Sequence, residues 1–185
     1  LKEWFSMRMN GAVLDLDNPK TINEKIQWLK LYGNRKRMTE LADKIAVRDF
    51  VAQTIGEKYL IPLVGVYNRA EDINWEELPS KFVLKPNHGS HWLSIIEDKS
   101  KIDIRKLCKT ANKWLKENYA FYHGFEMQYA KIPPKLMIER HLGEITSNLN
   151  DYKVWCFNGV PKYIQVHVNR QGAGETTTCI YSIPE

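Results

Sequence analysis

The stretch from residue 81 to residue 96 constrains the fold more than any other, because it sets a short polar loop between two apolar segments. The apolar run 82–84 ends at Lys85 and is stopped by Pro86, which predicts a mostly buried strand with a cation at its exit. Residues 87–90 predict a loop, after which an extended pattern resumes. Such a loop, with backbone N–H groups and a lysine beside it, is typical of a phosphate site. The same residues also fit a surface hairpin with a solvated lysine.

Composition is that of a folded chain with a modest positive charge. The 185 residues are 43% hydrophobic and 26% charged, which suits one domain with a proper core or two small lobes. A net charge of +5 suggests an anionic partner: a nucleic acid, a membrane surface or a phosphorylated small molecule. The charge is dispersed, however, and the densest cluster, 35–37, has only three members, fewer than a nucleic-acid tract usually has.

Cysteine usage and hydropathy favour a cytoplasmic location. Cys108, Cys156 and Cys179 are odd in number, far apart and set among apolar residues, so we expect small core residues in a reducing compartment. The apolar run 59–67 contains Pro62 and is about half of the ~20 residues that a membrane span needs. Neither a transmembrane segment nor a signal peptide is expected.

Helix signals are clearest in two segments. Thr21 and Glu24 have the spacing of a capping box, and Gly33 is expected to close that helix in a left-handed conformation. Asp103 predicts the N-cap of a long amphipathic helix in which Trp114 is a core residue rather than a ligand-stacking one.

A further helix is predicted from residue 39 to residue 55. It would place Lys44 and Arg48 four residues apart on one face, where two like charges repel. An anion would relieve this repulsion. The alternative is that both side chains reach into water or toward Asp43 and Asp49.

Short strands account for most of the remaining chain. Strand patterns occur at 59–67 and 135–138, and the pair 152–157 and 163–168 flanks Asn158-Gly159, a strong hairpin signal. A last strand is predicted from residue 176 to residue 182. This order of elements predicts an α+β fold of two lobes with antiparallel sheets and a cleft between them.

Several motifs, taken in order, resemble the ATP-grasp superfamily. They are Asp43-Lys44 with Arg48, the segment from Phe82 to Ser90, the segment from Ile138 to Leu142 and the segment from Asp151 to Gly159. Within that superfamily, three segments resemble the TupA-like ATP-grasp proteins, a branch named for a teichuronic-acid biosynthesis protein: 21–32, 41–44 and 150–153. The similarity runs from about residue 21 to residue 181.

The resemblance implies an ATP-grasp fold, with a nucleotide cleft flanked by the two sheets. It also implies an N-terminal helical segment (1–38), an N-terminal lobe with a phosphate-binding hairpin (39–142) and the start of a C-terminal lobe (143–185). The activity implied is that of an ATP-dependent ligase, which joins a carboxylate to an amine or similar nucleophile through an acylphosphate. Its partners would be a nucleotide and a precursor of a bacterial cell-surface polysaccharide, with no nucleic acid.

Site residues follow from the same resemblance. Lys44 and Lys85 would contact the ATP phosphates, and Asp151 would bind the ribose hydroxyls with Lys153 on the same face of its strand. The backbone of a four-residue loop would close over the phosphates: Asn87, His88, Gly89 and Ser90. A hinge would bind adenine largely through its main chain: Glu139, Arg140, His141 and Leu142.

Magnesium is the expected companion of ATP, and it needs carboxylate or carboxamide oxygens. In ATP-grasp proteins these come late, as an Asp and a Glu-x-Asn-like pair. The sequence reaches Glu185 before any such pair, so we expect the metal ligands beyond Glu185 and no full turnover by residues 1–185 alone.

Two alternatives from other classes remain open. A glycosyltransferase of a polysaccharide locus would need a metal motif such as Asp15-Leu16-Asp17, which follows no recognisable strand. A noncatalytic basic binding module is suggested by the positive charge and by the aromatic stretch 119–129, whose role the sequence leaves open.

Overall fold

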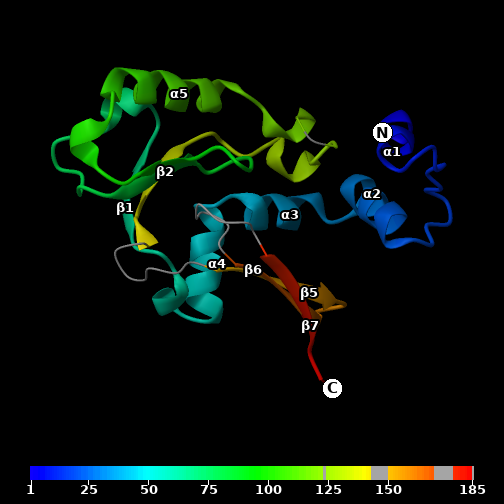
Figure 1. The fold of residues 1–185 in the computed structure, drawn as a ribbon. Coiled ribbons are helices and arrows are strands. Elements are labelled where there is room, and N and C mark those ends of the chain that lie inside the picture. The colour runs from blue at the N-terminus through cyan, green and yellow to red at the C-terminus, as the bar shows by residue number, and fades with distance from the viewer. Residues whose placement is uncertain (123, 143–149, 169–176, 185) are drawn as a thin grey trace. The chain divides into compact units, whose positions relative to one another are not determined.

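The computed structural model describes residues 1–122, 124–142, 150–168 and 177–184 (Figure 1). The chain forms two compact units, Leu1–Arg140 and His141–Glu185, and each is described here by itself. Residues 143 and 176, at which a lobe and a strand are predicted to begin, lie outside the described residues, as does residue 123 of the aromatic stretch. The domain limits at residues 38 and 142 stay predictions.

The first unit is built on a four-stranded antiparallel sheet in the order β1-β4-β2-β3. The strands are β1 (Leu63–Tyr67), β2 (Phe82–Pro86), β3 (Ser94–Ile96) and β4 (Leu136–Arg140). The predicted strand, loop and returning strand are therefore confirmed as β2 and β3. Pro86 belongs to β2 rather than stopping it: β3 pairs only with residues 82–84, so Pro86 has a neighbouring strand on one side alone.

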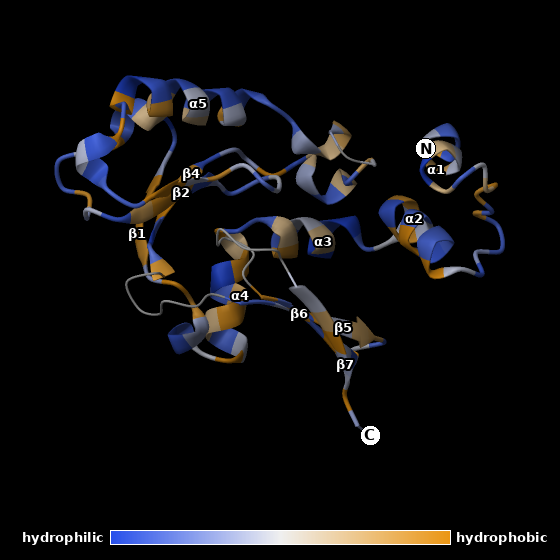
Figure 2. Cartoon of the chain, in the orientation of Figure 1, coloured by the Kyte–Doolittle hydropathy of each residue, from blue (hydrophilic) through white to orange (hydrophobic). Residues whose placement is uncertain are grey.

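Helix α5 (Ile104–Lys116) supplies much of the core of this unit. Asp103 caps the helix by accepting a hydrogen bond from the Lys106 N–H at 3.0 Å, as predicted. Apolar side chains spaced four and three residues apart form a stripe on α5, which is otherwise rich in hydrophilic residues (Figure 2). The stripe shares one buried cluster with the sheet: Leu107, Ala111 and Trp114 with Phe82, Leu84, Leu136 and Ile138. Trp114 is thus a core residue, as expected.

The first two helices of the chain are α1 (Lys2–Arg8) and α2 (Ile22–Tyr32). The capping box of α2 is present, with the Glu24 N–H 3.2 Å from Thr21 Oγ1 and the Thr21 N–H 2.8 Å from Glu24 Oε2. The left-handed conformation predicted for Gly33 is wrong, because Gly33 has φ −67° and ψ 167°. Glycine is needed there for close approach instead: a Cβ atom would lie 2.6 Å from the Leu29 carbonyl oxygen.

The single helix predicted from 39 to 55 is also wrong. The structure has α3 (Arg35–Ala42) and α4 (Ala46–Thr54), separated by a break at residues 43–45. At the break, Asp43 Oδ1 accepts a hydrogen bond from the Ile45 N–H at 2.9 Å, and the Lys44 N–H donates to the Asn87 carbonyl oxygen at 3.1 Å. These bonds replace helical ones, so Lys44 does not stack on Arg48 along a helix.

Short 3₁₀ turns connect the main elements of this unit: η1 (Glu57–Tyr59), η2 (Ala70–Asp72), η3 (Lys99–Lys101), η4 (Tyr119–Phe121) and η5 (Met127–Tyr129). The strand pattern at 59–67 becomes η1 followed by β1, which begins just after Pro62. Strand β4 runs two residues beyond its predicted end, to Arg140.

The second unit is a three-stranded antiparallel sheet of β5 (Asp151–Phe157), β6 (Val160–Val168) and β7 (Thr177–Ser182). Asn158 and Gly159 have φ values of 51° and 80° and join β5 to β6, which confirms the predicted hairpin. Cys156 is exposed, so the expected core position is wrong for this cysteine. The α+β class with antiparallel sheets is confirmed. Across the described residues, no helix combines the length and the apolar character needed to cross a bilayer.

Candidate functional site

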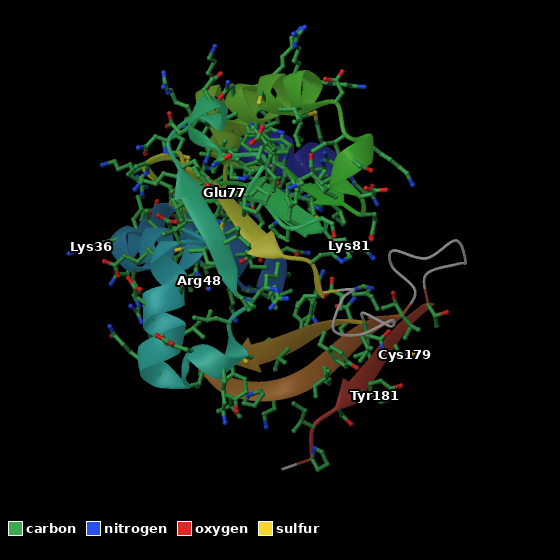
Figure 3. All side chains as sticks on the ribbon, turned by 90° about the vertical axis from the view of Figure 1, so that its left-hand side faces the viewer. Lys36, Arg48, Glu77, Lys81, Cys179 and Tyr181 are labelled. Carbon is green, nitrogen blue, oxygen red and sulfur yellow. The ribbon has the colours of Figure 1, made fainter. Side chains whose placement is uncertain are left out.

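Glu139 on β4 is the centre of a group of charged side chains in the first unit. Its Oε2 atom lies 2.5 Å from Lys85 Nζ, and its Oε1 atom lies 3.3 Å from Arg48 Nη1. Lys85 reaches it because Val83, two residues earlier on β2, pairs with Glu139, which makes Lys85 a diagonal neighbour on the same face. Arg48 reaches it from α4, where Figure 3 labels the residue. Its Nη2 donates to the Ile61 carbonyl oxygen, just before β1, at 2.8 Å.

Lys44 adds a third cation to this group. Its half-buried ammonium donates to the Gly89 carbonyl oxygen at 2.5 Å. Burial, together with the positive charge of Lys85, lowers the pKa of Lys44 from 10.5 to about 8, although Asp43 and Glu139 act in the opposite direction. Lys44, Arg48 and Lys85 form what we call the cation cluster. Its ammonium groups repel one another, so the arrangement favours binding of an anion.

Asn87 fixes the loop that joins β2 to β3, residues 87–93, which we call the β2–β3 loop. Asn87 is 1% exposed, and its Oδ1 accepts a hydrogen bond from the Lys135 N–H at 2.8 Å. Its Nδ2 donates to Asp43 Oδ1 at 3.0 Å and to the Pro133 carbonyl oxygen at 3.1 Å. The side chain is fully used within the protein, so Asn87 positions the loop and offers a ligand no side-chain group.

His88 has a similar role toward α5. Its Nε2 lies 3.1 Å from the Trp114 carbonyl oxygen and 3.2 Å from that of Glu117, at the C-terminal end of the helix. Burial lowers the pKa of His88, and on the other side of the ring Nδ1 lies 3.3 Å from Asn87 Oδ1. His88 therefore ties the loop to the end of α5.

Gly89 and the two residues after it carry backbone N–H groups that a ligand could use. Gly89 has φ +93°, and a Cβ atom there would lie 2.8 Å from the ring of Tyr119, so both its conformation and its space require glycine. Among the described residues, the backbone N–H groups of Gly89, Ser90 and His91 donate no hydrogen bond to a protein acceptor. These donors are available to a ligand.

The other predicted site residues lie further along the chain. Arg140 is exposed at the end of β4, and its N–H donates to the Pro62 carbonyl oxygen at 3.1 Å. His141 and Leu142 begin the second unit. Asp151 and Lys153 lie two residues apart on β5, hence on one face of that strand. The structure thus brings together Lys44, Lys85, Glu139 and residues 87–90, while roles shared with the second unit stay predictions.

Asp43 is a positioning residue that the sequence analysis did not assign. One oxygen, Oδ1, accepts from the Ile45 N–H and from Asn87 Nδ2, so it joins the break between α3 and α4 to the β2–β3 loop. The sequence signal that could have indicated the break is an aspartate inside a predicted helix. An aspartate side chain can accept a hydrogen bond from the backbone N–H two residues later and so compete with the helix.

Tyrosine side chains of the aromatic stretch 119–129, whose role the sequence leaves open, pack against the β2–β3 loop. The Trp92 ring centroid lies 5.1 Å from that of Tyr119 and 5.5 Å from that of Tyr122. Tyr119 and Tyr129 also meet edge to face at 5.1 Å. The stretch therefore supports the loop.

No group of three or more metal-binding side chains occurs within the described part of the chain. The carboxylates near the cation cluster do not fit magnesium, because Asp43 accepts N–H donors and Glu139 pairs with two cations. Asp15, from the only Asp-x-Asp motif, accepts from the N–H groups of Asp17 and Asn18 in a local turn.

Comparison with known proteins gives one finding. The model of a family described as TupA-like ATPgrasp matches residues 24–184. No curated protein and no solved structure gives a significant match.

Proposed function

Since this chain belongs to the TupA-like ATP-grasp family, we propose that the cation cluster and the β2–β3 loop bind the phosphates of ATP. The observation that carries the proposal is the convergence of Lys44 and Lys85 beside a loop with unpaired N–H donors. A transferring phosphoryl group needs positioned cations and backbone donors more than covalent partners. The first unit offers both.

Each residue has a distinct part in this site. Lys44 and Lys85 would bind phosphate oxygens as point charges, with Arg48 behind them on the far side of Glu139. The N–H groups of residues 89–91 would donate to the same oxygens. Glu139 holds Lys85 and Arg48 in place before the nucleotide arrives, and a bound phosphate would then compete with it for Lys85.

The reaction that suits this family is ATP-dependent ligation. The terminal phosphate would pass from ATP to a carboxylate, giving ADP and an acylphosphate, and a nucleophile such as an amine would then displace the phosphate. Magnesium, when bound, would neutralise phosphate charge, but its ligands are not among the residues near Glu139. We place the reaction in the assembly of a cell-surface polysaccharide because of the family resemblance, and in the cytoplasm because of the cysteine usage.

The rest of the nucleotide would use the residues that the resemblance assigns. Residues 139–142 would bind adenine through the main chain, and Asp151 would bind the ribose hydroxyls with Lys153 beside it. These roles involve residues of both units. The first test is therefore directed at the phosphate site, and it measures how far ATP stabilises the chain against thermal unfolding.

The direct test is a thermal-unfolding titration with ATP on the wild type, on Lys85→Ala and on Lys109→Ala. Lys109 is a matched control because it is an exposed lysine of α5. A ligand at one hundred times its Kd stabilises a protein by about 2.7 kcal/mol, so we expect saturable stabilisation of the wild type and of Lys109→Ala. Equal stabilisation of all three proteins, or of none, would overturn the proposal.

A further inference from the structure

A pocket lies beside the β2–β3 loop and is distinct from the cation cluster. It has a volume of about 340 Å³ and is lined by Ser90, His91, Tyr119, Glu126 and Tyr129. Gly89 connects the two places: its carbonyl oxygen accepts a hydrogen bond from Lys44 Nζ, and a Cβ atom on it would lie 2.8 Å from the Tyr119 ring. A ligand in this pocket would therefore lie beside the loop that we propose to bind the phosphates.

Glu126 gives the pocket a negative charge, which also acts on the nearby Lys30 by raising its pKa against the effect of burial. Within the part of the chain that the structure describes, its carboxylate has no ion pair and no hydrogen bond. The nearby cation Lys30 donates instead to the Gly124 carbonyl oxygen at 2.7 Å. After burial, the charge of Glu126 is the next cause that raises the pKa of both Tyr119 and Tyr129. The carboxylate therefore acts directly on the pocket walls.

The backbone on both sides of the pocket is held in a left-handed conformation. His91 has φ +63° and Phe125, just before Glu126, has φ +59°. This conformation is uncommon for residues other than glycine, and for a bulky residue such as phenylalanine it is a true outlier. Such strain persists where surrounding structure holds it, commonly at binding sites. Here it aims residues 90–91 and Glu126 into one space.

The walls are rigid and aromatic. Tyr119 is 3% exposed and is packed among Trp92, Tyr122 and Tyr129 by ring contacts. Ser90 Oγ lies 3.1 Å from His91 Nδ1, which supplies a polar pair at the loop side. A site built this way before the ligand arrives loses little entropy on binding.

From these features we propose that the pocket binds a small polyhydroxylated primary amine such as an amino sugar. The ammonium group pairs with Glu126 and lies against the π-electron density of Tyr129. The hydroxyl groups meet Ser90 and His91, and the apolar face of the ring meets the aromatic walls. An anion is disfavoured, because Glu126 would repel it. The identification of this amine as the acceptor of the ligase reaction rests on the proposed function.

The experiment uses glucosamine as the probe and N-acetylglucosamine as its neutral counterpart. Thermal unfolding of the chain is followed below neutral pH, where the amine is protonated. We expect saturable stabilisation by glucosamine and at least a tenfold weaker effect of N-acetylglucosamine. Glu126→Gln should weaken glucosamine binding at least tenfold, whereas Glu77→Gln, the same change at an exposed turn residue, should leave it unchanged.

Two variants separate this proposal from the phosphate site. Lys85→Ala should lose the response to ATP and keep the response to glucosamine, while Glu126→Gln should do the reverse. Because the Glu126 side chain makes no hydrogen bond to a described residue, Glu126→Gln should fold normally, and Tyr129→Leu serves as a second test of the same wall. No response to glucosamine, an equal response to both sugars, or a full response by Glu126→Gln would overturn the proposal. A glucosamine response without an ATP response would overturn the phosphate site alone.

Discussion

Replacing Glu139 by glutamine should make the free protein less stable and its binding of ATP tighter. In the structure this carboxylate forms ion pairs with Lys85 Nζ at 2.5 Å and with Arg48 Nη1 at 3.3 Å, and the Glu139 side chain is only 7% exposed. Glutamine keeps the shape and one acceptor but removes the charge that holds both cations. Losing one charged hydrogen-bonding partner costs about 1.5–3 kcal/mol. We therefore expect a clear fall in Tm without ligand.

The gain in affinity follows from competition for Lys85. A phosphate oxygen bound on the other side of the ammonium would lie roughly 4 Å from the Glu139 carboxylate. Two unit charges at that separation repel by about 4 kcal/mol at an effective dielectric constant of 20. Water and salt ions take up part of this repulsion, so we expect about 1.4 kcal/mol to remain, which is about tenfold in Kd.

The assay measures Kd by isothermal titration for ATP and for tripolyphosphate, which has the phosphates without the base. Both ligands should bind Glu139→Gln more tightly, and the gain should shrink at high salt. Glu77→Gln makes the same change of net charge at an exposed residue, so it reports any long-range effect. Weaker binding of tripolyphosphate to Glu139→Gln than to the wild type would refute the competition between the carboxylate and phosphate.

The remaining predictions concern three residues of the site: Lys44, Asn87 and Gly89. Because the pKa of Lys44 is about 8 rather than 10.5, the Lys44 side chain of the folded protein is mostly charged below pH 8 and mostly neutral above it. The affinity for ATP should therefore fall about tenfold from one pH unit below 8 to one pH unit above it. This pH dependence should be absent in Lys44→Gln. The unfolded chain holds more protons than the folded one between pH 8 and 10.5, so this residue should make the unliganded protein more stable as pH rises through that window, which denaturant titrations at several pH values would show. Asn87→Ala removes the hydrogen bonds that this buried side chain makes to Asp43, Pro133 and Lys135, as well as its contact with His88. It should lower the free energy of unfolding, measured by urea titration, by about 2–4 kcal/mol. A loss below about 0.5 kcal/mol would contradict the positioning role. Gly89→Ala should lower the free energy of unfolding by about 1–3 kcal/mol, because Gly89 has a positive φ, and should weaken ATP binding by displacing the loop. The control is Gly11→Ala, at φ +85° with open space around it, which should leave ATP binding unchanged.

Features that depend on neighbouring residues could be predicted from the sequence. The capping box of α2, the Asp103 cap and the Asn158-Gly159 turn each involve groups a few residues apart, so short-range chemistry decides them. Strand β2 and its lysine were predicted for the same reason: an apolar run followed by a charge and a proline describes a strand end wherever the strand lies.

Features that depend on distant partners could not be predicted. The break at residues 43–45 requires the Asn87 carbonyl and carboxamide groups, which are more than forty positions away along the chain. The ion pair between Lys85 and Glu139 requires the register of β2 on β4. The pocket at Glu126 likewise gathers side chains from the β2–β3 loop and from two 3₁₀ turns, and no local pattern reports their meeting.

The attachment of the β2–β3 loop has a consequence for how ligands enter. The loop is pinned at residue 87 to the Asp43 side chain and the Lys44 N–H, at residue 88 to the last turn of α5, and at residue 89 to the Lys44 ammonium. A segment anchored at three successive residues cannot swing open as a lid would. Ligand exchange at this edge of the sheet should therefore be limited by shedding water from the charged groups, and residues in the helix break should govern how fast nucleotide leaves.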